Sequence, residues 1–597
     1  MEDKKLDYLN HIKSSLQKEI NILERSHDTS LLRCNLISCD NHIIIFNCVG
    51  KVKCDEEYTI FYDNKKVASM KIIKTGHSEI YGRVSKKFTE EKFFIQKSNP
   101  NYNLIKMAKI AEKINPKQVH NEIINSWLGQ NKFEDESIEE SINDYFDPLL
   151  NTSQKNAVSG ILKKKSYKII GPPGTGKTRT IVEIIMQLLK RNNRVLVAGP
   201  SNIAVDNILD RFKTSEYCVK NNVEFFRLGS SHKSENKSFN LIDIAREIKR
   251  LEIKNGAKKE KGNNKKIFKS NNKSKKYIKN SKNKKRDEKQ KVKKETNNDN
   301  NNIDKKFNNK NDTFNITEFV DKKIKNSTLI FSTLFSSFKI KSKFDWVIID
   351  EACQSLELES LIAVIKAPRY ILVGDPFQLG PVAEFEELKF TLFERLNLKT
   401  YILKEQYRMC NQLMEYSNSY FYKNEIKTPF DQIQRFLFFE NSPILFIDTF
   451  DSFFRESESN NSKLNITEVE LVEKVYKYIQ SQNNKLDIGI ITPYSSQAIA
   501  IRERIDDENV KISTVDGFQG QEKDVIIVSL VRSNDHREIG FLDEARRMNV
   551  AITRCKLGLA IIGDSRTFKT EFYKKYFEFL NKNSLYIDPN MLDELLK

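Results

Sequence analysis

The sequence predicts an α/β protein with two successive parallel sheets, preceded by a small β-barrel and helices. Three observations carry this prediction. Strands alternate with helices from residue 150 onward, several of those strands are apolar throughout, and short β-rich runs precede them. A chain of 597 residues, of which 39% are hydrophobic, has room for about three or four domains with buried cores.

The part of the chain before residue 150 divides into three segments with different patterns. Residues 1–29 carry apolar side chains at helical spacing, so we expect an N-terminal helix. Residues 30–100 hold several short β-rich runs, which predict a small barrel. Residues 101–149 return to helical spacing and predict a helical stalk. The glycines that separate the short strands are Gly50, Gly76 and Gly82.

Two α/β blocks follow, at residues 150–390 and 391–597. In each block, short apolar strands are separated by helical stretches, which is the pattern of a parallel sheet covered on both faces. The predicted strands are 167–170, 194–198, 346–349 and 370–373 in the first block, and 488–491, 525–530 and 557–562 in the second.

The positive charge of the chain is concentrated in one stretch of the first block. Residues 251–310 hold 22 Lys and Arg against 7 Asp and Glu, a net charge of +15, so the remaining residues contribute only +4 of the total +19. The part from about Asn255 to Asp312 has almost no apolar side chains and is predicted to be disordered. It is either a basic arm that contacts phosphates or directs nuclear import, or a solvated surface insertion. We favour the insertion, because such charge runs are usually solvated.

The same composition excludes several classes of protein. No run of about 18 apolar residues is present, so we expect no membrane partner, and the charged N-terminus predicts no secretory signal. Eight cysteines fit a reducing compartment, so a cytoplasmic or nuclear location is expected. One cluster of Cys and His lacks the close Cys pair typical of zinc sites, so no structural zinc is predicted. Its members are Cys34, Cys39, His42, Cys48 and Cys54.

The strongest functional motif is a phosphate-binding loop at residues 171–178, with a predicted strand before it and an amphipathic helix after it. Its glycines let backbone N–H groups face phosphates, and the helix N-terminus favours negative charge. Lys177 is expected to neutralise phosphate charge, and the Thr178 hydroxyl to ligate Mg²⁺. The loop consists of Gly171, Pro172, Pro173, Gly174, Thr175, Gly176, Lys177 and Thr178.

A pair of carboxylates, Asp350 and Glu351, directly follows the apolar strand 346–349. Acidic side chains at the carboxyl end of a parallel strand face the ligand crevice. We expect Asp350 to hold Mg²⁺ through water, and Glu351 to orient and deprotonate the attacking water. Taken alone, the pair fits an acidic helix cap equally well, and the phosphate-binding loop favours the catalytic interpretation.

A third strand end, after 370–373, carries the stretch Gly374 to Pro381, which contains Gln378. The Gln378 amide is expected to bond the γ-phosphate or the attacking water. In isolation, the stretch is more typical of a strand–turn with a polar tip.

With five further motifs, these residues give the chain its resemblance to a known family. It resembles superfamily 1 helicases of the branch that includes the nonsense-mediated-decay helicase and senataxin, and is most similar to the immunoglobulin-mu-binding-protein type. The resemblance spans residues 150–566. It implies that the two α/β blocks are RecA-like P-loop NTPase domains. The further motifs are Thr152-Ser153-Gln154, Pro200 to Asn207, Gln406 to Met409, Ser513 to Glu522 and Arg547 to Arg554.

The resemblance implies specific contacts to the nucleotide. Gln154 reads the adenine edge, and Tyr407 stacks on the adenine ring. Arg408 and Arg554 reach the γ-phosphate from the second block as arginine fingers, and Glu522 contacts the ribose or the phosphate-sensor region. Each assignment has a plainer alternative, such as Tyr407 being a packed core ring.

The resemblance also implies a grip on a nucleic-acid backbone by both blocks. In the second block, the expected nucleic-acid contacts lie in the segment that couples nucleic-acid binding to ATP hydrolysis. Some of these residues have structural alternatives, such as a strand residue or a helix cap. The expected contacts are Ser201, Asn202, Ser332 and Thr333 in the first block, and Thr514 and Asp516 in the second.

The implied activity is that of a 5′→3′ helicase or translocase that uses ATP and Mg²⁺ on single-stranded RNA or DNA. We expect a monomer, with a ribonucleoprotein or ribosome as a candidate partner. Two alternatives stay open: a translocase that remodels ribonucleoprotein with little unwinding, and an inactive NTPase that serves as a binding scaffold. The role of Arg179, a basic residue directly after the phosphate-binding loop, is left open.

Overall fold

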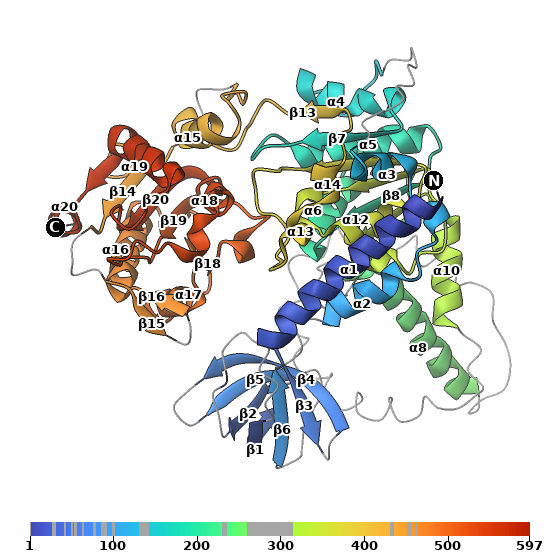
Figure 1. Ribbon diagram of the computed structural model, residues 1–597, viewed down its shortest axis with the longest axis horizontal. Coiled ribbons are helices and arrows are strands. Elements are labelled where there is room, and N and C mark those ends of the chain that lie inside the picture. The colour runs from blue at the N-terminus through green and yellow to red at the C-terminus, as the bar shows by residue number, and fades with distance from the viewer. Residues whose placement is uncertain are drawn as a thin grey trace.

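The computed structural model contains a barrel, two α/β units and a set of N-terminal helices (Figure 1). It describes residues 2–26, 32–40, 43–48, 52, 57–62, 65–75, 79–84, 92–97, 102–129, 142–229, 236–259, 315–429, 435–450, 455–459 and 462–596. His42, Gly50, Cys54, Gly76 and residues 260–312 of the predicted disordered segment lie outside these ranges. Among the described residues, no helix is long and apolar enough to cross a membrane.

The predicted barrel is confirmed as a closed, antiparallel six-stranded barrel in the order β1-β2-β5-β4-β3-β6. Burial alternates along its strands, with Ile44 and Phe46 of β2 facing the interior, as the two-residue period of a strand requires. Cys34 and Cys48 are directly opposed on β1 and β2. The strands are β1 (Leu32–Asp40), β2 (Ile43–Cys48), β3 (Glu57–Tyr62), β4 (Lys65–Thr75), β5 (Ile80–Val84) and β6 (Lys92–Lys97).

The helices on either side of the barrel in sequence pack together against the first α/β unit. Helix α1 (Glu2–Ser26) lies along α2 (Tyr102–Ala111) and contacts α3 (Asn121–Trp127). Its apolar stripe enters the same core as one face of the first sheet. The Tyr8 hydroxyl donates to Glu357 Oε1 at 2.6 Å. The predicted N-terminal helix and stalk helices are therefore built onto the first α/β unit, and α1 reaches from it toward the barrel (Figure 1).

The first sheet has seven parallel strands in the order β13-β7-β12-β11-β8-β10-β9. Helices α4 to α7 cover one face, and α10 to α14 with α1 to α3 cover the other. The strands are β7 (Ser166–Ile170), β8 (Val195–Gly199), β9 (Phe225–Leu228), β10 (Leu329–Thr333), β11 (Trp346–Ile349), β12 (Arg369–Gly374) and β13 (Thr400–Ile402). The helices are α4 (Thr152–Lys163), α5 (Lys177–Lys190), α6 (Asn202–Lys213), α7 (Glu216–Asn221), α8 (Leu241–Lys259), α10 (Ile316–Asn326), α11 (Leu334–Ser337), α12 (Glu357–Val364), α13 (Glu386–Lys389) and α14 (Leu392–Arg395).

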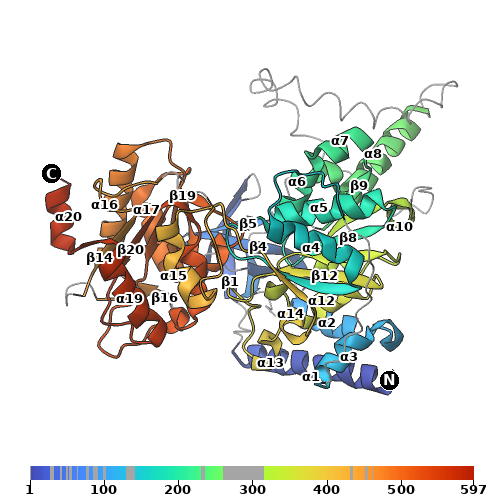
Figure 2. The same cartoon turned by 90° about the horizontal axis from the view of Figure 1, so that it is seen from above.

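The second sheet has six parallel strands in the order β18-β17-β19-β20-β14-β21. Helices α15, α18 and α19 cover one face, and α16, α17 and α20 the other. The strands are β14 (Ile444–Asp448), β17 (Ile488–Thr492), β18 (Lys511–Thr514), β19 (Lys523–Ser529), β20 (Cys555–Gly563) and β21 (Leu585–Ile587), with a separate hairpin of β15 (Ser457–Ser459) and β16 (Ser462–Leu464). The helices are α15 (Asn411–Phe421), α16 (Ile466–Gln482), α17 (Ser495–Ile505), α18 (Ala545–Ile552), α19 (Glu571–Asn583) and α20 (Pro589–Leu595). Figure 2 shows the two units side by side.

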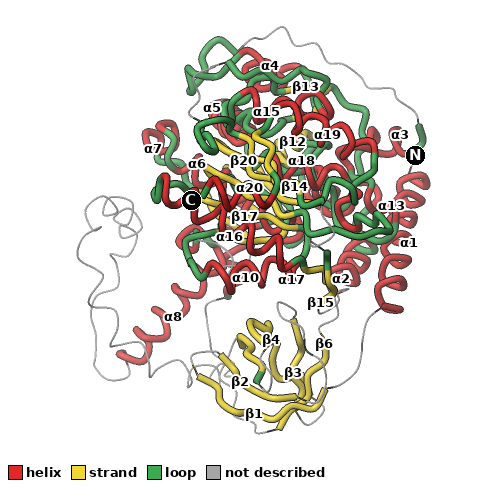
Figure 3. The backbone as a smooth tube through the Cα atoms, turned by 90° about the vertical axis from the view of Figure 1, so that its left-hand side faces the viewer, coloured by secondary structure: helices red, strands yellow, loops and turns green. Residues whose placement is uncertain are grey.

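Two boundaries differ from the sequence prediction. Strand β13 pairs with β7, so the first sheet includes residues 400–402, which the alternation of strands and helices assigned to the second block. Helix α8 runs to Lys259 and projects from the body of the molecule (Figure 3), so its backbone is helical for four residues past Asn255. The Lys and Ala residues there favour a helix. The disorder predicted from about Asn255 is therefore wrong for residues 255–259.

Candidate nucleotide site between the two α/β units

The phosphate-binding loop connects β7 to α5 at the carboxyl edge of the first sheet. Gly174 and Gly176 have φ angles of 73° and 80°, in the left-handed region that favours glycine. A Cβ on Gly176 would lie 2.6 Å from Gln154 Nε2. Lys177 Nζ donates to Gly171 O at 2.5 Å. The loop thus curls around the first turn of α5, and the Lys177 ammonium lies over it.

Residues expected to read the adenine meet on one side of this loop. Gln154 is buried, and its Nε2 donates to Thr175 O at 3.0 Å while its Oε1 accepts from Asn151 N at 3.0 Å. The Tyr407 hydroxyl accepts from Asn151 Nδ2 at 3.0 Å, and Tyr407 N donates to Gly174 O at 3.0 Å. The Tyr407 side chain is 40% exposed, so its ring is available to a ligand and is not a packed core ring.

Arg179, whose role the sequence left open, anchors the segment that leads into α4. Its guanidinium forms a bidentate ion pair with Asp147. The buried Glu183 of the same helix accepts the N–H groups of Phe146 and Asp147, each at 3.0 Å. A cavity of about 560 Å³ beside this segment is lined by Phe146, Pro148, Arg179 and Arg211 among others. Sequence reasoning missed Asp147 and Glu183, because nothing in the local sequence links residues 36 positions apart.

The acidic pair follows β11, two strands away from β7 in the sheet. Asp350 is 5% exposed, and burial, followed by the charge of Glu351, raises its pKa to about 7, although Lys177 acts in the opposite direction. Glu351 has a φ of 53°, an unusual backbone conformation of the kind often found at functional sites. Gln354 Nε2 donates to Glu351 Oε2 at 2.6 Å. Two carboxylates therefore lie close together, with Lys177 as the cation whose charge acts on Asp350.

Gln378 lies at a contact between the two α/β units. It is buried, and its Nε2 donates to Asp375 Oδ2 at 2.7 Å within the first unit. Its Oε1 accepts from Arg554 Nη2 of the second unit at 3.1 Å. Burial, followed by the charge of Arg408, lowers the pKa of Arg554 to about 10. The side-chain amide of Gln378 is thus bonded at both ends, once to each unit.

Arg408 links the tyrosine-bearing segment to the second unit. Its guanidinium contacts Glu522 Oε2 through Nε at 2.9 Å and through Nη2 at 2.7 Å, and Nη1 donates to Thr553 O at 2.7 Å. Burial disfavours the Glu522 carboxylate, but the charges of Arg408 and Lys556 outweigh it and lower the pKa of Glu522. Arg408, Arg554 and Glu522 therefore form one charged cluster.

The residues expected to grip nucleic acid in the first unit gather at one edge of its sheet. Ser332 and Thr333 of β10 lie opposite Ala198 and Gly199 of β8, just before Ser201. Ser201 caps α6 by accepting from Ala204 N at 3.1 Å. Ser332 is fully buried, and its hydroxyl donates to Thr333 O at 2.9 Å. Of the four, Ser332 is therefore the one whose side chain faces the interior.

The corresponding residues of the second unit lie close to this edge. Thr514 ends β18, and Asp516 begins a short turn that continues to Phe518. A Cβ on Gly520, just after that turn, would lie 3.7 Å from Ile203 Cγ2 of α6. The segments around Asn202 and Asp516 thus approach one another across the two units.

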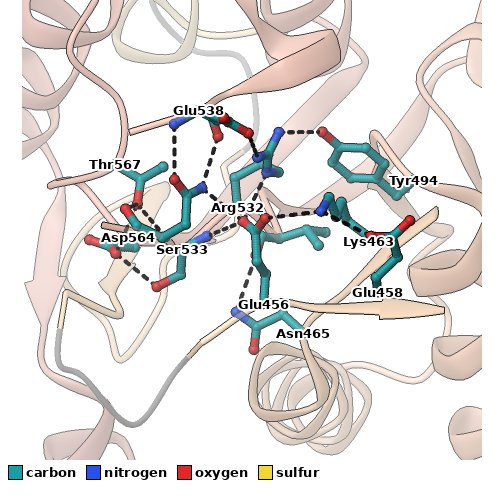
Figure 4. A network of polar contacts seen from close by, with 12 residues as sticks. Glu456, Glu458, Lys463, Asn465, Tyr494, Arg532, Ser533, Glu538, Asp564 and Thr567 are labelled. Carbon is teal, nitrogen blue, oxygen red and sulfur yellow. Dashed lines mark hydrogen bonds and ion pairs between the residues drawn. The ribbon is translucent and has the colours of Figure 1, made fainter. Parts of the chain in front are cut away.

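A polar network that sequence reasoning missed lies beyond the carboxyl ends of β17, β19 and β20 (Figure 4). Arg532 is buried, with Nε donating to Glu456 Oε2 at 2.8 Å and Nη1 donating to the Tyr494 hydroxyl at 3.1 Å. Glu456 also accepts from Ser533 N at 2.9 Å. Val531, just before Arg532, has a φ of 71°, which is strained for a β-branched residue. The network holds this strained loop in place.

Glu468, behind this network, gives a prediction about pH. It is fully buried, accepts from Ser529 Oγ at 2.6 Å and Val531 N at 2.9 Å, and burial raises its pKa to about 8. Because the folded state holds this proton more tightly than the unfolded chain does, the free energy of unfolding should fall as pH rises from about 4.3 to about 8. Glu468→Gln should remove this dependence. In denaturant unfolding at pH 5 and pH 8, wild type should lose more stability than the variant.

The half-exposed Glu470 on the same helix offers a matched control, Glu470→Gln, which should change with pH as wild type does. If Glu468→Gln loses as much stability between pH 5 and pH 8 as wild type does, Glu468 is not the group that holds this proton.

Comparisons with known proteins place this chain in a family. Two family models, each described as an AAA domain, match residues 149–384 and 388–566. The DNA polymerase alpha-associated DNA helicase A of Schizosaccharomyces pombe is 32% identical over 82% of this chain and 75% of its own length. The DNA-binding protein SMUBP-2 of Rattus norvegicus is 31% identical over 72% of this chain and 44% of its own length. The regulator of nonsense transcripts 1 homolog of Arabidopsis thaliana is 30% identical over 71% of this chain and 33% of its own length.

Proposed function

The chain belongs to the superfamily 1 helicases, in the branch of the regulators of nonsense transcripts and senataxin, and we propose which of its residues bind and hydrolyse ATP. It is an ATP-dependent nucleic-acid helicase. The two α/β units are its RecA-like domains, with the first continuing to about residue 402, and ATP is hydrolysed between them. The observation that carries this proposal is Gln378, bonded at one end to Asp375 and at the other to Arg554 of the opposite unit.

In this proposal, Lys177 and the loop N–H groups hold the phosphates, and Gln154 and Tyr407 hold the base. Glu351 accepts a proton from the attacking water. Arg408 and Arg554 stabilise the charge that develops on the transferred phosphoryl group, and Gln378 reports its presence. Gln154 lies in α4 and Lys177 begins α5, while Glu351 and Gln378 follow strands β11 and β12. Tyr407 and Arg408 follow β13, and Arg554 directly precedes β20. Glu522, in ion contact with Arg408, sets the position of that guanidinium.

The donor set also fits a magnesium ion. Asp350 is buried beside a second carboxylate with Lys177 opposing it, so a divalent cation would compensate the excess negative charge. Thr178 would ligate it directly and Asp350 through water. When bound, the ion neutralises phosphate charge.

The substrate we propose is single-stranded nucleic acid, gripped along its backbone with 5′→3′ movement. Asn202, Ser201 and Thr333 of the first unit, with Thr514 and Asp516 of the second, support this. Ser332 acts through Thr333, whose carbonyl it bonds. The names of the relatives point to DNA in two cases and to transcripts in the third, so both RNA and DNA are candidate substrates. We propose a cytoplasmic or nuclear monomer, with ribonucleoprotein or ribosome contacts as candidate associations.

The experiment that tests this proposal measures ATPase rate with and without a single-stranded oligonucleotide, beside strand displacement from a tailed duplex. We expect stimulation by RNA, DNA or both, together with displacement. Stimulated ATPase without displacement would favour a translocase that remodels ribonucleoprotein. No ATPase activity at all would favour an inactive scaffold and would contradict the proposed roles.

The basic insertion gives a second test of the domain organisation. Deleting residues 260–312, which begins after α8, should leave stimulated ATPase within about twofold of wild type, because a long surface loop adds little closure entropy. The slope of log K against log[salt] for single-strand binding should also be unchanged. A length-matched variant with its Lys and Arg changed to Ser serves as control. A shallower slope in both variants would show phosphate contacts by the insertion. Loss of stimulated ATPase would contradict our assignment of the insertion to the surface.

A further inference from the structure

The carboxylate of Asp375 is shared between the two α/β units. It is 1% exposed, and its Oδ2 accepts both from Gln378 Nε2 at 2.7 Å and from the Tyr422 hydroxyl at 2.8 Å. Tyr422 directly follows α15, which packs on the second sheet. The second unit therefore reaches Gln378 along two routes. One is the direct contact from Arg554, and the other passes through Tyr422 and Asp375.

Asn549 completes the second route from helix α18. Its side chain is fully buried, and Nδ2 donates to Phe377 O at 2.7 Å and to the Tyr422 hydroxyl at 3.2 Å. Its Oδ1 accepts from Ser417 Oγ at 2.6 Å, which fixes the orientation of the amide. Two groups of the loop Asp375–Gln378 are thus bonded to the second unit. The Asp375 carboxylate accepts from Tyr422, and the Phe377 carbonyl accepts from Asn549.

An aromatic contact lies beside these hydrogen bonds. The ring of Tyr422 meets that of Phe377 edge-on, with 5.3 Å between centroids and an interplanar angle of 86°. Burial holds the pKa of Tyr422 well above its usual range, so its hydroxyl keeps the proton that it donates to Asp375. In such an environment each hydrogen bond fixes geometry closely, because an unmade bond leaves a buried polar atom without a partner.

We propose that Tyr422 and Asn549 are positioning residues that hold the Asp375–Gln378 loop against the second unit, so that Gln378 is aligned only when the two units are correctly seated. This inference rests on the proposed role of Gln378 at the γ-phosphate. Neither residue touches the nucleotide in this account. Both act through the amide of Gln378, which Asp375 orients from one side and Arg554 from the other.

The test is Tyr422→Phe, which removes one hydroxyl and keeps the ring. A matched control exists within the preceding helix α15, because Tyr416 is also buried and its hydroxyl donates to Phe572 O at 2.6 Å, away from Gln378. We expect Tyr422→Phe to lower the kcat of stimulated ATPase roughly tenfold, as misplacement of a reacting group does. The KM for ATP should change little. Tyr416→Phe should lower the melting temperature by a similar amount and leave kcat unchanged. Equal kcat values for the two variants would overturn the proposal.

A double variant distinguishes positioning from an independent effect. If Tyr422 acts through Gln378, Tyr422→Phe should cause no further loss of kcat in a Gln378→Ala background, whereas independent effects would multiply. Multiplied losses would overturn the proposal. Asn549→Ala should behave as Tyr422→Phe does in both backgrounds.

The failure of this inference and that of the proposed function are distinguishable. If Gln378→Ala alone leaves kcat unchanged, the sensor role assigned under the proposed function is wrong, and the positioning role falls with it. If Gln378→Ala lowers kcat but Tyr422→Phe and Asn549→Ala do not, only the positioning role is wrong.

Discussion

Glu351→Gln is expected to lower the kcat of ATP hydrolysis by about 10³-fold, the range of a general base, while ATP binding stays close to that of wild type. The amide keeps the size of the side chain and can still meet Gln354, which donates to Glu351 Oε2 in the wild-type chain. It cannot accept a proton from water. Binding of a fluorescent ATP analogue, measured beside single-turnover hydrolysis, separates the two effects.

Lys177→Ala is expected to abolish ATP binding, whereas Glu351→Gln is expected to preserve it. This change removes the ammonium that lies over the phosphate-binding loop, so nucleotide binding itself should be lost. Asp144→Asn, which alters the exposed ion pair with Lys190 at the far end of α5, is a control that should keep both binding and hydrolysis within about tenfold. Equal loss of nucleotide binding in Glu351→Gln and Lys177→Ala would show that the two roles are assigned wrongly.

The second large effect is expected at Arg554. Arg554→Ala should lower kcat by roughly 10³-fold or more, as loss of an arginine finger does, with a smaller effect on ATP affinity. The guanidinium is buried and donates to Gln378 Oε1 and Val550 O, so it lies at the junction of the two units. Single-turnover hydrolysis with saturating ATP and single-stranded nucleic acid measures the effect.

Arg547 on α18 supplies the matched control for Arg554. It donates to Phe541 O and pairs with Glu544 within the second unit. Arg547→Ala should therefore leave kcat within about tenfold of wild type, because a partly exposed ion pair contributes little. A surviving kcat in Arg554→Ala would place Arg554 away from the γ-phosphate.

Much of the candidate site could be read from the sequence because its chemistry needs short, contiguous residue patterns. The phosphate-binding loop, the acidic pair and Gln378 each follow a strand, and parallel strands bring their carboxyl ends to one edge. Asp375 and Asn549 lie within motifs that the sequence shows, but their contacts with Tyr422 could not be found in this way. Their contacts join residues 47 and 127 positions apart, and nothing local marks a tyrosine after a helix as a partner of a distant aspartate.

In the fold too, features set by local sequence could be predicted, and features set by distant strand pairing could not. The barrel was predictable because several short β-rich runs are a local pattern, although Gly82, expected to separate two strands, lies within β5. Strand β13 was assigned to the wrong side of the predicted boundary because residues 400–402 pair with β7, more than 200 positions earlier. The burial of Ser332 could not be predicted for a related reason. Its strand lies between β8 and β9, and the order of strands in a sheet cannot be inferred from one segment of sequence.

The most direct test of the account is strand displacement by the wild-type chain from duplexes that carry a 5′ tail, a 3′ tail or no tail. Each duplex is incubated with ATP or with a non-hydrolysable analogue. We expect displacement of the 5′-tailed duplex with ATP, no displacement with the analogue, and no displacement of the blunt duplex. Equal displacement with the analogue, or no displacement from any duplex while ATP is consumed, would contradict the claim that hydrolysis between the two units drives unwinding.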